Sequence, residues 1–383
     1  MGALTGYKVI ELAGIGPAPM GGMILADMGA EVIRIERPGA ADPKVAEPIS
    51  GRNKKSVVLD LKQDAGKAAL MTLIEQADAL IDPYRPGVCE KLGFGPDECL
   101  ARNPRLVFAR MTGWGQTGPL AQAAGHDLNY IAITGALHAI GRRDERPVVP
   151  LNLVGDFGGG GMLLVTGVMG GLLEAARSGQ GQVVDVAMVD GTAQLMWMMQ
   201  GFQQIGAWNA DERESNLLDG AAHFYDTYEC ADGKYVAIGA IEPQFYAELL
   251  ARTEISDSQF QSQHDAAQWP ELKQKLGAVL KTKTRDEWDA LMAGSDACFA
   301  PVLTMVEASQ YEANTARSVY TEVAGLTHPS PAPRFQRTPS AIRHGTRALG
   351  ADTVSVLKAS GIGDGEIQEL LAAGAARAGD SEE

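Results

Sequence analysis

Two polar residues in glycine-rich, largely apolar surroundings are candidates for acid–base chemistry. His126 follows a glycine and begins the stretch HDLNYIAITGALHAIG, and Asp156 precedes four glycines in LVGDFGGGG. Imidazole and carboxyl groups can both take up and release protons near neutral pH when their surroundings adjust their pKa values. These two residue types therefore suit an acid and a base that act on one carbon atom.

Each of the two residues also has a purely structural interpretation. A lone histidine near an apolar run is most often a core residue, and Asp156 would suit the N-cap of the helix expected from Met162 to about Arg177. The glycines would let a ligand approach the backbone and leave N–H groups free to meet a developing oxyanion. Spacing alone leaves both interpretations open and indicates an α/β enzyme with a candidate His/Asp pair.

The elements that must position this pair alternate between strand and helix. Alternation of this kind predicts a parallel sheet with helices on both faces, and ligands bind at the strand ends of such sheets. Helical spacing is expected at 16–29 and 64–77, and buried strands are expected at 7–13, 30–36, 56–62, 105–113 and 181–191.

The pattern changes near Ala222, where a hairpin is expected within 224–242 with ADG in its turn. Short amphipathic helices follow, which indicates a smaller domain of mixed type. We therefore expect an α/β fold with a large Rossmann-like domain and a small α+β domain. The expected divisions are 1–190 (first part of the large domain), 191–224 (helical linker), 225–315 (small domain) and 316–383 (return linker and C-terminal part of the large domain).

The composition and charge of the chain argue against several kinds of binding partner. The chain has 383 residues and a formal net charge of -15, a sign that repels nucleic acid and anionic membranes. The four cysteines form no C-x-x-C pair, and no cysteine–histidine group has zinc spacing, so we expect no metal and a cytoplasmic location. We also expect no signal peptide and no membrane span, since the longest near-apolar run falls short of about 20 residues.

Basic side chains gather in the N-terminal part of this acidic chain, at expected strand ends and in loops. Arginine and lysine at such places suit phosphate groups, whereas any single member is as readily ordinary solvated surface. The group consists of Arg37, Arg52, Lys54, Lys55, Lys62, Arg85 and Lys91.

The stretch GIGPAP after the first strand raises a different hypothesis, the binding of a nicotinamide cofactor. Glu36 lies about where a ribose-binding acid would be. Pro19 replaces the third glycine of that fingerprint, so a plain strand–turn–helix connection is favoured.

Longer blocks of the chain resemble the family III CoA transferases and, within them, the α-methylacyl-CoA racemases. The resemblance covers essentially the whole chain and rests on blocks such as VIELAGIGPAPMGGMILADMGAEVIRIERP, YRPGVCEKLGFGP, VPLNLVGDFGGGG and YDTYECADGKYVAIGAIEPQFY. The block GHDLNY discriminates between the two groups. Transferases of the family share the aspartate before the glycines but generally lack this histidine.

The resemblance implies the family III CoA-transferase fold, an interlocked homodimer and an acyl-CoA substrate, with no cofactor beyond the CoA that the substrate carries. It implies that His126 and Asp156 are the acid/base residues and that Glu242 assists the histidine from the small domain. The residues implied to bind substrate or CoA are Arg37, Leu59, Asp60, Leu61, Lys62, Pro83, Tyr84, Arg85, Lys91, Gly125, His126, Asp127, Leu128, Asn129 and Tyr130.

Two positions depart from the family's pattern. Lys91 stands where close relatives often carry arginine, so the charge is kept but the bidentate fork is lost. Pro83 stands where glycine or asparagine is common, and it has no N–H to donate.

The implied activity is racemisation of 2-methylacyl-CoA thioesters by proton transfer through an enolate. Two rival functions stay open. In CoA transfer, Asp156 would attack an acyl-CoA as a nucleophile, and the reaction would need a carboxylate acceptor. A catalytically idle CoA-binding subunit would keep the basic cluster without needing His126, Asp156 and Glu242 together.

Overall fold

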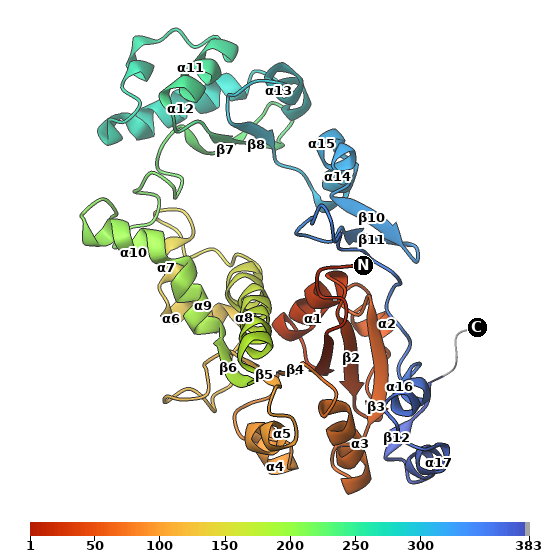
Figure 1. Ribbon diagram of the computed structural model, residues 1–383. Helices are drawn as coiled ribbons and strands as arrows, with labels where there is room; N and C mark the ends of the chain where they lie inside the picture. Colours follow the sequence, from red (N-terminus) through yellow and green to blue (C-terminus); the bar gives the residue numbers. More distant parts are fainter. Residues whose placement is uncertain (380–383) are drawn as a thin grey trace. The chain divides into compact units, whose positions relative to one another are not determined.

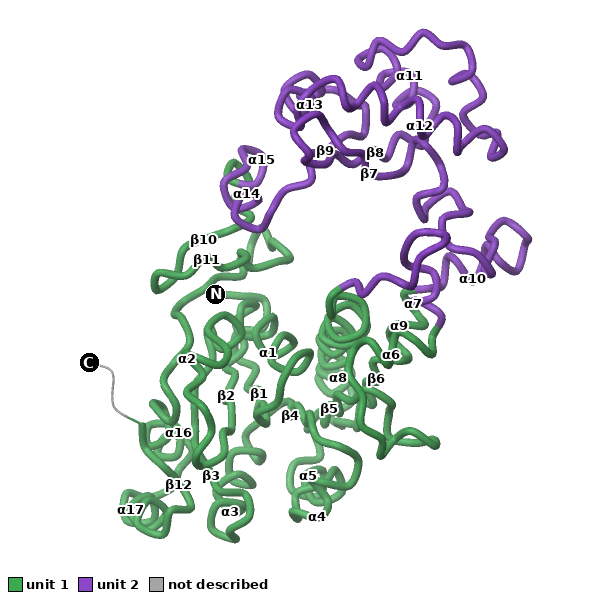
Figure 2. The backbone as a smooth tube through the Cα atoms, turned by 180° about the vertical axis from the view of Figure 1, so that it is seen from behind, with its two compact units in different colours: residues 1–134, 151–195, 315–383 green, residues 135–150, 196–314 purple. Residues whose placement is uncertain are grey.

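The computed structural model describes residues 1–379, and these form two compact units (Figure 2). Among the described residues, the first unit comprises 1–134, 151–195 and 315–379, and the second comprises 135–150 and 196–314. The first unit is therefore interrupted twice by the second. The segment 191–224, expected as a separate linker, is divided between the units: 191–195 belongs to the first and 196–224 to the second.

Within the described residues, a seven-stranded sheet lies at the centre of the first unit (Figure 1). Its order is β12-β3-β2-β1-β4-β5-β6, and neighbours pair in parallel except for β12, which is antiparallel to β3. The expected parallel sheet is confirmed. Its strands are β1 (Lys8–Leu12), β2 (Glu31–Glu36), β3 (Lys54–Leu59), β4 (Ala79–Asp82), β5 (Val107–Thr112), β6 (Gln182–Ala187) and β12 (Ala376–Arg377).

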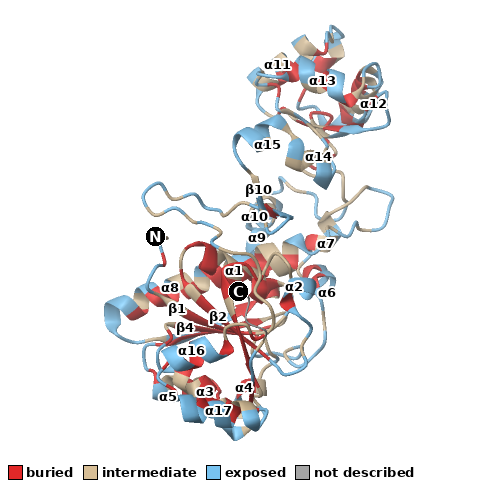
Figure 3. Cartoon of the chain, turned by 90° about the vertical axis from the view of Figure 1, so that its right-hand side faces the viewer, coloured by how far each residue is buried: buried red, intermediate tan, exposed pale blue. Residues whose placement is uncertain are grey.

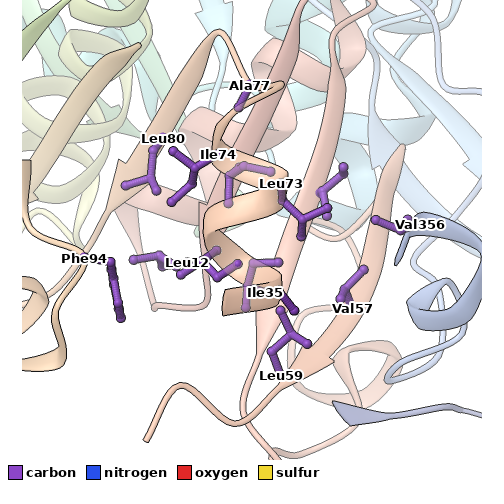
Figure 4. Close-up of a cluster of buried hydrophobic side chains, with 14 of the residues drawn as sticks. Leu12, Ile35, Val57, Leu59, Leu73, Ile74, Ala77, Leu80, Phe94 and Val356 are labelled. Atoms are coloured by element: carbon purple, nitrogen blue, oxygen red, sulfur yellow. The ribbon is translucent and has the colours of Figure 1, made fainter. Parts of the chain in front are cut away.

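Alternate residues of the strands enter two separate apolar cores, one on each face of the sheet. On one face, Leu12 and Ile35 belong to a core that also holds Leu73 from a covering helix (Figure 4). On the other face, Val9 belongs to a core that also holds Val168 from another helix. Burial on both faces explains why these strands read as nearly continuous apolar runs.

The helices of the first unit present buried stripes to the sheet and exposed faces outward (Figure 3). They are α1 (Pro17–Asp27), α2 (Pro43–Ala46), α3 (Asp64–Ile74), α4 (Val88–Leu92), α5 (Pro96–Arg102), α6 (Asp127–Ile133), η1 (Leu153–Gly161), α8 (Met162–Ser178), α9 (Met188–Leu195), α16 (Thr353–Ala359) and α17 (Asp364–Ala372). A short hairpin of β10 (Tyr320–Val323) and β11 (Leu326–Pro329) also belongs to this unit.

The second unit has its own core around a small antiparallel sheet. The expected hairpin is present as β7 (Tyr225–Glu229) and β8 (Tyr235–Gly239), and β9 (Phe299–Pro301) adds a third strand. Phe224, Leu272 and Trp288 are among the side chains buried in this core. The helices are α7 (Ala136–Ala139), α10 (Trp197–Gln204), α11 (Pro243–Arg252), α12 (Trp269–Leu280), α13 (Arg285–Met292) and α14 (Met305–Gln310), and α15 (Glu312–Ala316) lies at the junction.

The helix that contains the four glycines begins earlier than expected. A π-helix, η1, starts at Leu153 and leads directly into α8, so Asp156 lies inside a helix and the N-cap interpretation is wrong. Within residues 1–379, the continuous segment Leu153–Ser178 is the one helix long and apolar enough to cross a membrane by length and composition. Half of its most apolar window is buried in the fold, which accounts for its apolar character.

Candidate active site

A pocket of about 520 Å³ lies in the first unit, at the carboxyl ends of β1, β4 and β5. The strand order reverses direction between β1 and β4, and ligands bind at this point in sheets of this type. The volume suits a small-molecule site. The wall is built by the loops after the three strands, around 14–18, 83–86 and 111–114, together with His126 and Asp156.

His126 lies at the N-terminal end of α6, with its backbone held on both sides. Its carbonyl oxygen accepts the N–H of Asn129 at 2.7 Å, and its own N–H donates to the Asn129 side chain at 3.1 Å. His126 is exposed and lines the pocket. The interpretation of His126 as a core histidine is therefore wrong.

Asp156 is held by two neighbours. Its side-chain Oδ2 accepts a hydrogen bond from Asn152 at 3.1 Å, and its backbone N–H donates to Oδ1 of Asp127 at 2.7 Å. Asp127 is buried and directly follows His126 in the chain. The backbones that carry the two candidate acid/base groups are thus fastened to each other through one carboxylate.

The surroundings of Asp156 change how readily it gives up its proton. Burial raises the pKa of Asp156 above its ordinary value, the hydrogen bond from Asn152 lowers it, the charge of Asp127 raises it, and His126 lowers it. The raised pKa is the net result. A carboxyl group with a raised pKa can serve as an acid as well as a base near neutral pH.

The glycines after Asp156 have a packing role that the sequence does not predict. A Cβ atom at Gly159 would lie 2.7 Å from the backbone nitrogen of Thr192, and one at Gly160 would lie 3.0 Å from the side chain of Met188. The glycines therefore allow η1 to pack closely against α9. Their expected role of offering N–H groups to an oxyanion stays a prediction.

The GIG stretch after β1 lies beside the candidate aspartate. Gly16 has a φ of 69°, and a Cβ atom there would lie 3.4 Å from Oδ2 of Asp156. This loop therefore lets the chain turn into α1 while leaving the carboxylate accessible from the pocket. The glycines are visible in the sequence, but their spacing suggests nicotinamide binding rather than this contact. No sequence pattern indicates that Asn152 belongs to the site.

Two aromatic rings shape the loop that precedes His126. Trp114 and Tyr130 meet edge to face, with ring centroids 4.8 Å apart, and the Tyr130 hydroxyl donates to the carbonyl oxygen of Gly125. A Cβ atom at Gly125 would lie 2.8 Å from both rings. Gly125 and Tyr130, both expected at the substrate site, line the pocket and fix the approach of the chain to His126.

The residues expected to hold CoA follow neighbouring parallel strands, so they lie along one edge of the sheet. Pro83, Tyr84 and Arg85 line the pocket itself, whereas Arg37, Leu59–Lys62 and Lys91 do not. Leu128 and Asn129 are exposed but lie outside the pocket lining.

We call the residues expected to bind CoA the CoA set. Its four basic side chains are available for an anionic ligand. All four are exposed, and none forms a salt bridge with another residue of the described chain. They are Arg37, Lys62, Arg85 and Lys91.

Two members of the CoA set are held in ways that restrict their contacts. The side chain of Leu59 is buried in the core of the sheet, so only its backbone is available to a ligand. The ring of Pro83 packs closely on Gly14, where a Cβ atom would lie 2.7 Å from it. Pro83 cannot donate an N–H to a ligand, but its ring packs against Gly14. The sequence does not reveal this contact.

Three other basic residues from the N-terminal cluster take part in ion pairs within the fold. Arg52 binds Asp27 at 2.6 Å, Lys54 binds Glu11 at 2.7 Å, and Lys55 binds Glu31 at 2.5 Å. Arg52 and Lys54 are buried. For Arg52 and Lys54 the assignment to phosphate binding is wrong, because these buried pairs already neutralise charges inside the protein. The side chains of Lys55 and Glu31 are 41% and 39% exposed, so phosphate binding by Lys55 stays a prediction.

Glu36 is also engaged within the fold. It is buried at the end of β2, and its Oε1 lies 2.8 Å from Nε of Arg34. Burial raises its pKa to about 6. A carboxylate held in this way is not free to bind a ribose, which agrees with the weak glycine fingerprint.

Glu242 lies in the second unit, at the N-cap of α11 and after β8. Its expected role as the partner of His126 stays a prediction. Its neighbour Pro243 occupies the first turn of α11, where the missing N–H costs nothing.

The fold and the pocket define an α/β protein with a histidine and an aspartate at the switch point of a Rossmann-like sheet. The model of CoA-transferase family III matches residues 4–353, so the chain belongs to this family. It is 45% identical over 370 residues to alpha-methylacyl-CoA racemase of Mus musculus and 43% identical over 371 residues to that of Homo sapiens, with 96% of each chain covered in both comparisons.

Solved structures agree with this fold. A Mycobacterium tuberculosis protein in an orthorhombic crystal form is 26% identical, with a TM-score of 0.78 over 92% of this chain and 98% of that one. A CAIB/BAIF family protein from Brucella suis has a TM-score of 0.80 over 94% of this chain and 99% of that one. At 24% identity, the latter supports the fold alone.

Proposed function

We propose that this protein interconverts the two epimers of 2-methylacyl-CoA thioesters, which differ in configuration at the carbon next to the thioester carbonyl. The observation that carries this proposal is that His126 and Asp156 line one pocket. The identity of 45% to the mouse racemase, over nearly the full length of both chains, supports it.

Inversion at this carbon needs a proton to leave one face and another to arrive at the opposite face. The thioester acidifies the C–H bond only modestly, so a base must be in place before the bond breaks. We propose that one of His126 and Asp156 removes the α-proton to form an enolate, and that the other, already protonated, delivers a proton to the other face. The roles exchange when the opposite epimer binds.

The raised pKa of Asp156 fits this exchange of roles, because it brings the protonated carboxyl closer to neutral pH. Asn152 counteracts the rise by donating to the carboxylate, which favours the ionised form. We further propose that Glu242 supports the imidazolium form of His126, since a nearby carboxylate favours the charged imidazole. No metal or second cofactor is needed for these steps.

The CoA part of the substrate would bind along the sheet edge next to the pocket. Arg85 lines the pocket, Arg37 and Lys62 lie just after β2 and β3, and Lys91 lies in α4. All are exposed and suit phosphate groups. We propose that the working form is an interlocked homodimer, by analogy with the family that the sequence resembles. We also propose a cytoplasmic location, because the four cysteines suit a reducing compartment.

The direct test is incubation of one pure 2-methylacyl-CoA epimer in deuterated water with no carboxylate acceptor. We expect the opposite epimer to form and one deuterium to enter at the α-carbon, measured by chiral separation and mass. An Arg105→Ala variant serves as a control, because Arg105 is exposed and lies away from the pocket at the other end of β5. CoA transfer that requires a carboxylate, without deuterium incorporation in its absence, would establish the transferase alternative instead.

A further inference from the structure

A buried pair of opposite charges directly precedes two residues of the pocket lining, Pro83 and Met111, without lining the pocket itself. Asp82 ends β4 and Arg110 lies opposite it on β5, in register between the paired strands. Asp82 is 3% exposed and Arg110 is 9% exposed. Neither residue has a role in the acid–base chemistry described above.

Asp82 is connected to the pocket loop that follows it. Its Oδ1 accepts the backbone N–H of Tyr84 at 2.9 Å, which closes a tight turn over Pro83. The thiol of Cys89 also hydrogen-bonds to this carboxylate, and Nε of Arg110 lies 3.9 Å from Oδ2. One carboxylate thus holds the start of the loop that carries Arg85 into the pocket wall.

Arg110 extends the connection to the next pocket loop. One guanidinium nitrogen donates to Oε1 of Gln116 at 2.8 Å, and another donates to Glu90. The backbone N–H of Gln116 in turn donates to Asp185 on β6 at 3.0 Å. Arg110 therefore links the end of β4 and α4, which flank one pocket loop, to the loop after β5.

Stability alone is a weak reason for this arrangement. Burying a charged pair removes two groups from water, and an apolar pair of similar size often stabilises a fold as well or better. The Nε atom of Arg110 is also buried without a hydrogen-bond partner in the described part of the chain, which adds a further cost. The charges are placed where they orient two loops that meet at the pocket.

We propose that Asp82 and Arg110 are positioning residues that hold the two pocket loops in the geometry required to bind acyl-CoA, and so set its affinity more than the rate of proton transfer. This inference rests on the proposed function for the identity of the ligand. It predicts that damage to the pair acts on ground-state and transition-state binding alike, because both include the same CoA contacts.

The buried pair should also make the affinity for CoA depend on pH. Burial raises the pKa of Asp82 to about 6. The N–H of Tyr84, the thiol of Cys89 and the charge of Arg110 lower this pKa, and the charge of Glu90 raises it. The charge of Asp82 in turn raises the pKa of Cys99 in α5. As the pH falls through this value, Asp82 becomes neutral and its attraction for Arg110 is lost, while Arg110 keeps its ion pair with Glu90. Affinity for CoA should therefore weaken on acidification.

Matched substitutions separate positioning from stability. Asp82→Ala removes the acceptor and the charge, and Asp82→Asn keeps an acceptor for Tyr84 but cannot titrate. Asp78→Ala is the control, because Asp78 immediately precedes the same strand at its other end and accepts the N–H of Lys8 at 2.8 Å, away from the pocket. The measurements are the Kd for CoA by calorimetry, KM and kcat for 2-methylacyl-CoA, and Tm.

We expect Asp82→Ala to raise Kd and KM about tenfold, with kcat changed by less than about threefold. Asp82→Asn keeps the acceptor but lacks the charge, so at pH 7.5 its Kd should lie between those of the wild type and Asp82→Ala. Asp78→Ala should change Tm only. Between pH 7.5 and 5.5 the wild-type Kd should rise more than that of Asp82→Asn. The comparison between variants is essential, because a phosphate monoester such as that of CoA also titrates near pH ~6.

Unchanged Kd and KM in Asp82→Ala, or equal losses in Asp82→Ala and Asp78→Ala, would overturn the positioning role. If Asp82→Ala does not fold, an identical pH dependence in wild type and Asp82→Asn would overturn it. A wild-type protein that binds CoA but does not epimerise the substrate would contradict the proposed function, while the Kd comparison would still decide this inference. Absence of CoA binding by the wild type would contradict both.

Discussion

The carboxylate of Asp127 accepts the backbone N–H of Asp156 at 2.7 Å, and Asp127 is the residue that directly follows His126. This contact joins the start of α6 to the first turn of η1. It therefore fixes the separation of the two proposed acid/base groups at the level of the backbone, before either side chain is considered. It also places a second negative charge close to Asp156.

Asp127→Ala should lower kcat about 10- to 100-fold, because the backbone at Asp156 loses its buried acceptor and the two bases lose their fixed separation. Asp127→Asn keeps an acceptor and removes the charge, so its loss of kcat should be smaller. Because the charge of Asp127 raises the pKa of Asp156, the limb of the pH–rate profile that reports Asp156 should move to lower pH. Steady-state rates for both epimers between pH 5 and 9 measure both effects. A shift to higher pH would contradict this account.

Asn152→Ala should move the same limb in the opposite direction. The hydrogen bond from Asn152 to Oδ2 favours the ionised carboxylate, so its removal should raise the pKa of Asp156 further. The two variants together form an internal comparison with opposite expected signs. Shifts of the same sign in Asn152→Ala and Asp127→Asn would show that these neighbours do not control the ionisation of Asp156.

Arg85→Ala should weaken binding more than it slows chemistry. We expect KM to rise about tenfold with little change in kcat, since a contact to CoA is shared by the ground and transition states. Arg105→Ala is a matched control, because it removes an exposed arginine that does not line the pocket. A large fall in kcat with unchanged KM would remove Arg85 from the proposed CoA site.

The buried histidine of the second unit should make folding stability depend on pH. His223 lies 2.7 Å from the Tyr246 hydroxyl, which itself donates to the carbonyl of Phe260, so Nε2 of His223 must be the donor. Its Nδ1 is buried without a partner in the described residues. Burial, with His264 and Lys273 nearby, lowers the pKa of His223 to about 4 from the ordinary 6.5.

Because the folded-state pKa is below the unfolded value, the contribution of His223 is complete above pH 6.5 and is lost as the pH falls toward 4. The free energy of unfolding of the second unit should drop by about 2 to 3 kcal/mol between pH 7 and 4.5 from this group. His223→Gln should flatten this dependence. Urea unfolding at several pH values, followed by tryptophan fluorescence, measures it, and equal slopes for both proteins would contradict the assignment.

Sequence patterns predict the helices and strands well, but they predict the surroundings of individual charged side chains poorly. The alternation of apolar runs locates the strands, because each is buried on both faces, and family blocks draw attention to His126 and Asp156. The π-helix around Asp156 is not predicted, since four successive glycines normally disfavour a helix and their value lies in the close approach of α9. Whether Lys54 is solvated or buried against Glu11 depends on contacts between distant segments, which one sequence does not reveal.

The same limit applies to residues that support the site. Asn152 and Asp127 act on Asp156 from four residues upstream and from another helix, and neither contact follows from residue type. Pairing between Asp82 and Arg110 depends on the register of β4 against β5. These relationships require the fold, whereas the identity of the two candidate bases requires only the sequence.

The most direct test of the two-base mechanism is the rate of α-proton exchange of each pure epimer in deuterated water, measured for His126→Ala and Asp156→Ala. Loss of one base should stop inversion, with a deficit of about 10²–10⁴-fold, while the remaining base can still exchange a proton on its own face. We predict exchange without inversion for one epimer in His126→Ala and for the opposite epimer in Asp156→Ala. Equal loss of exchange for both epimers in both variants would contradict the placement of the two residues on opposite faces of the α-carbon.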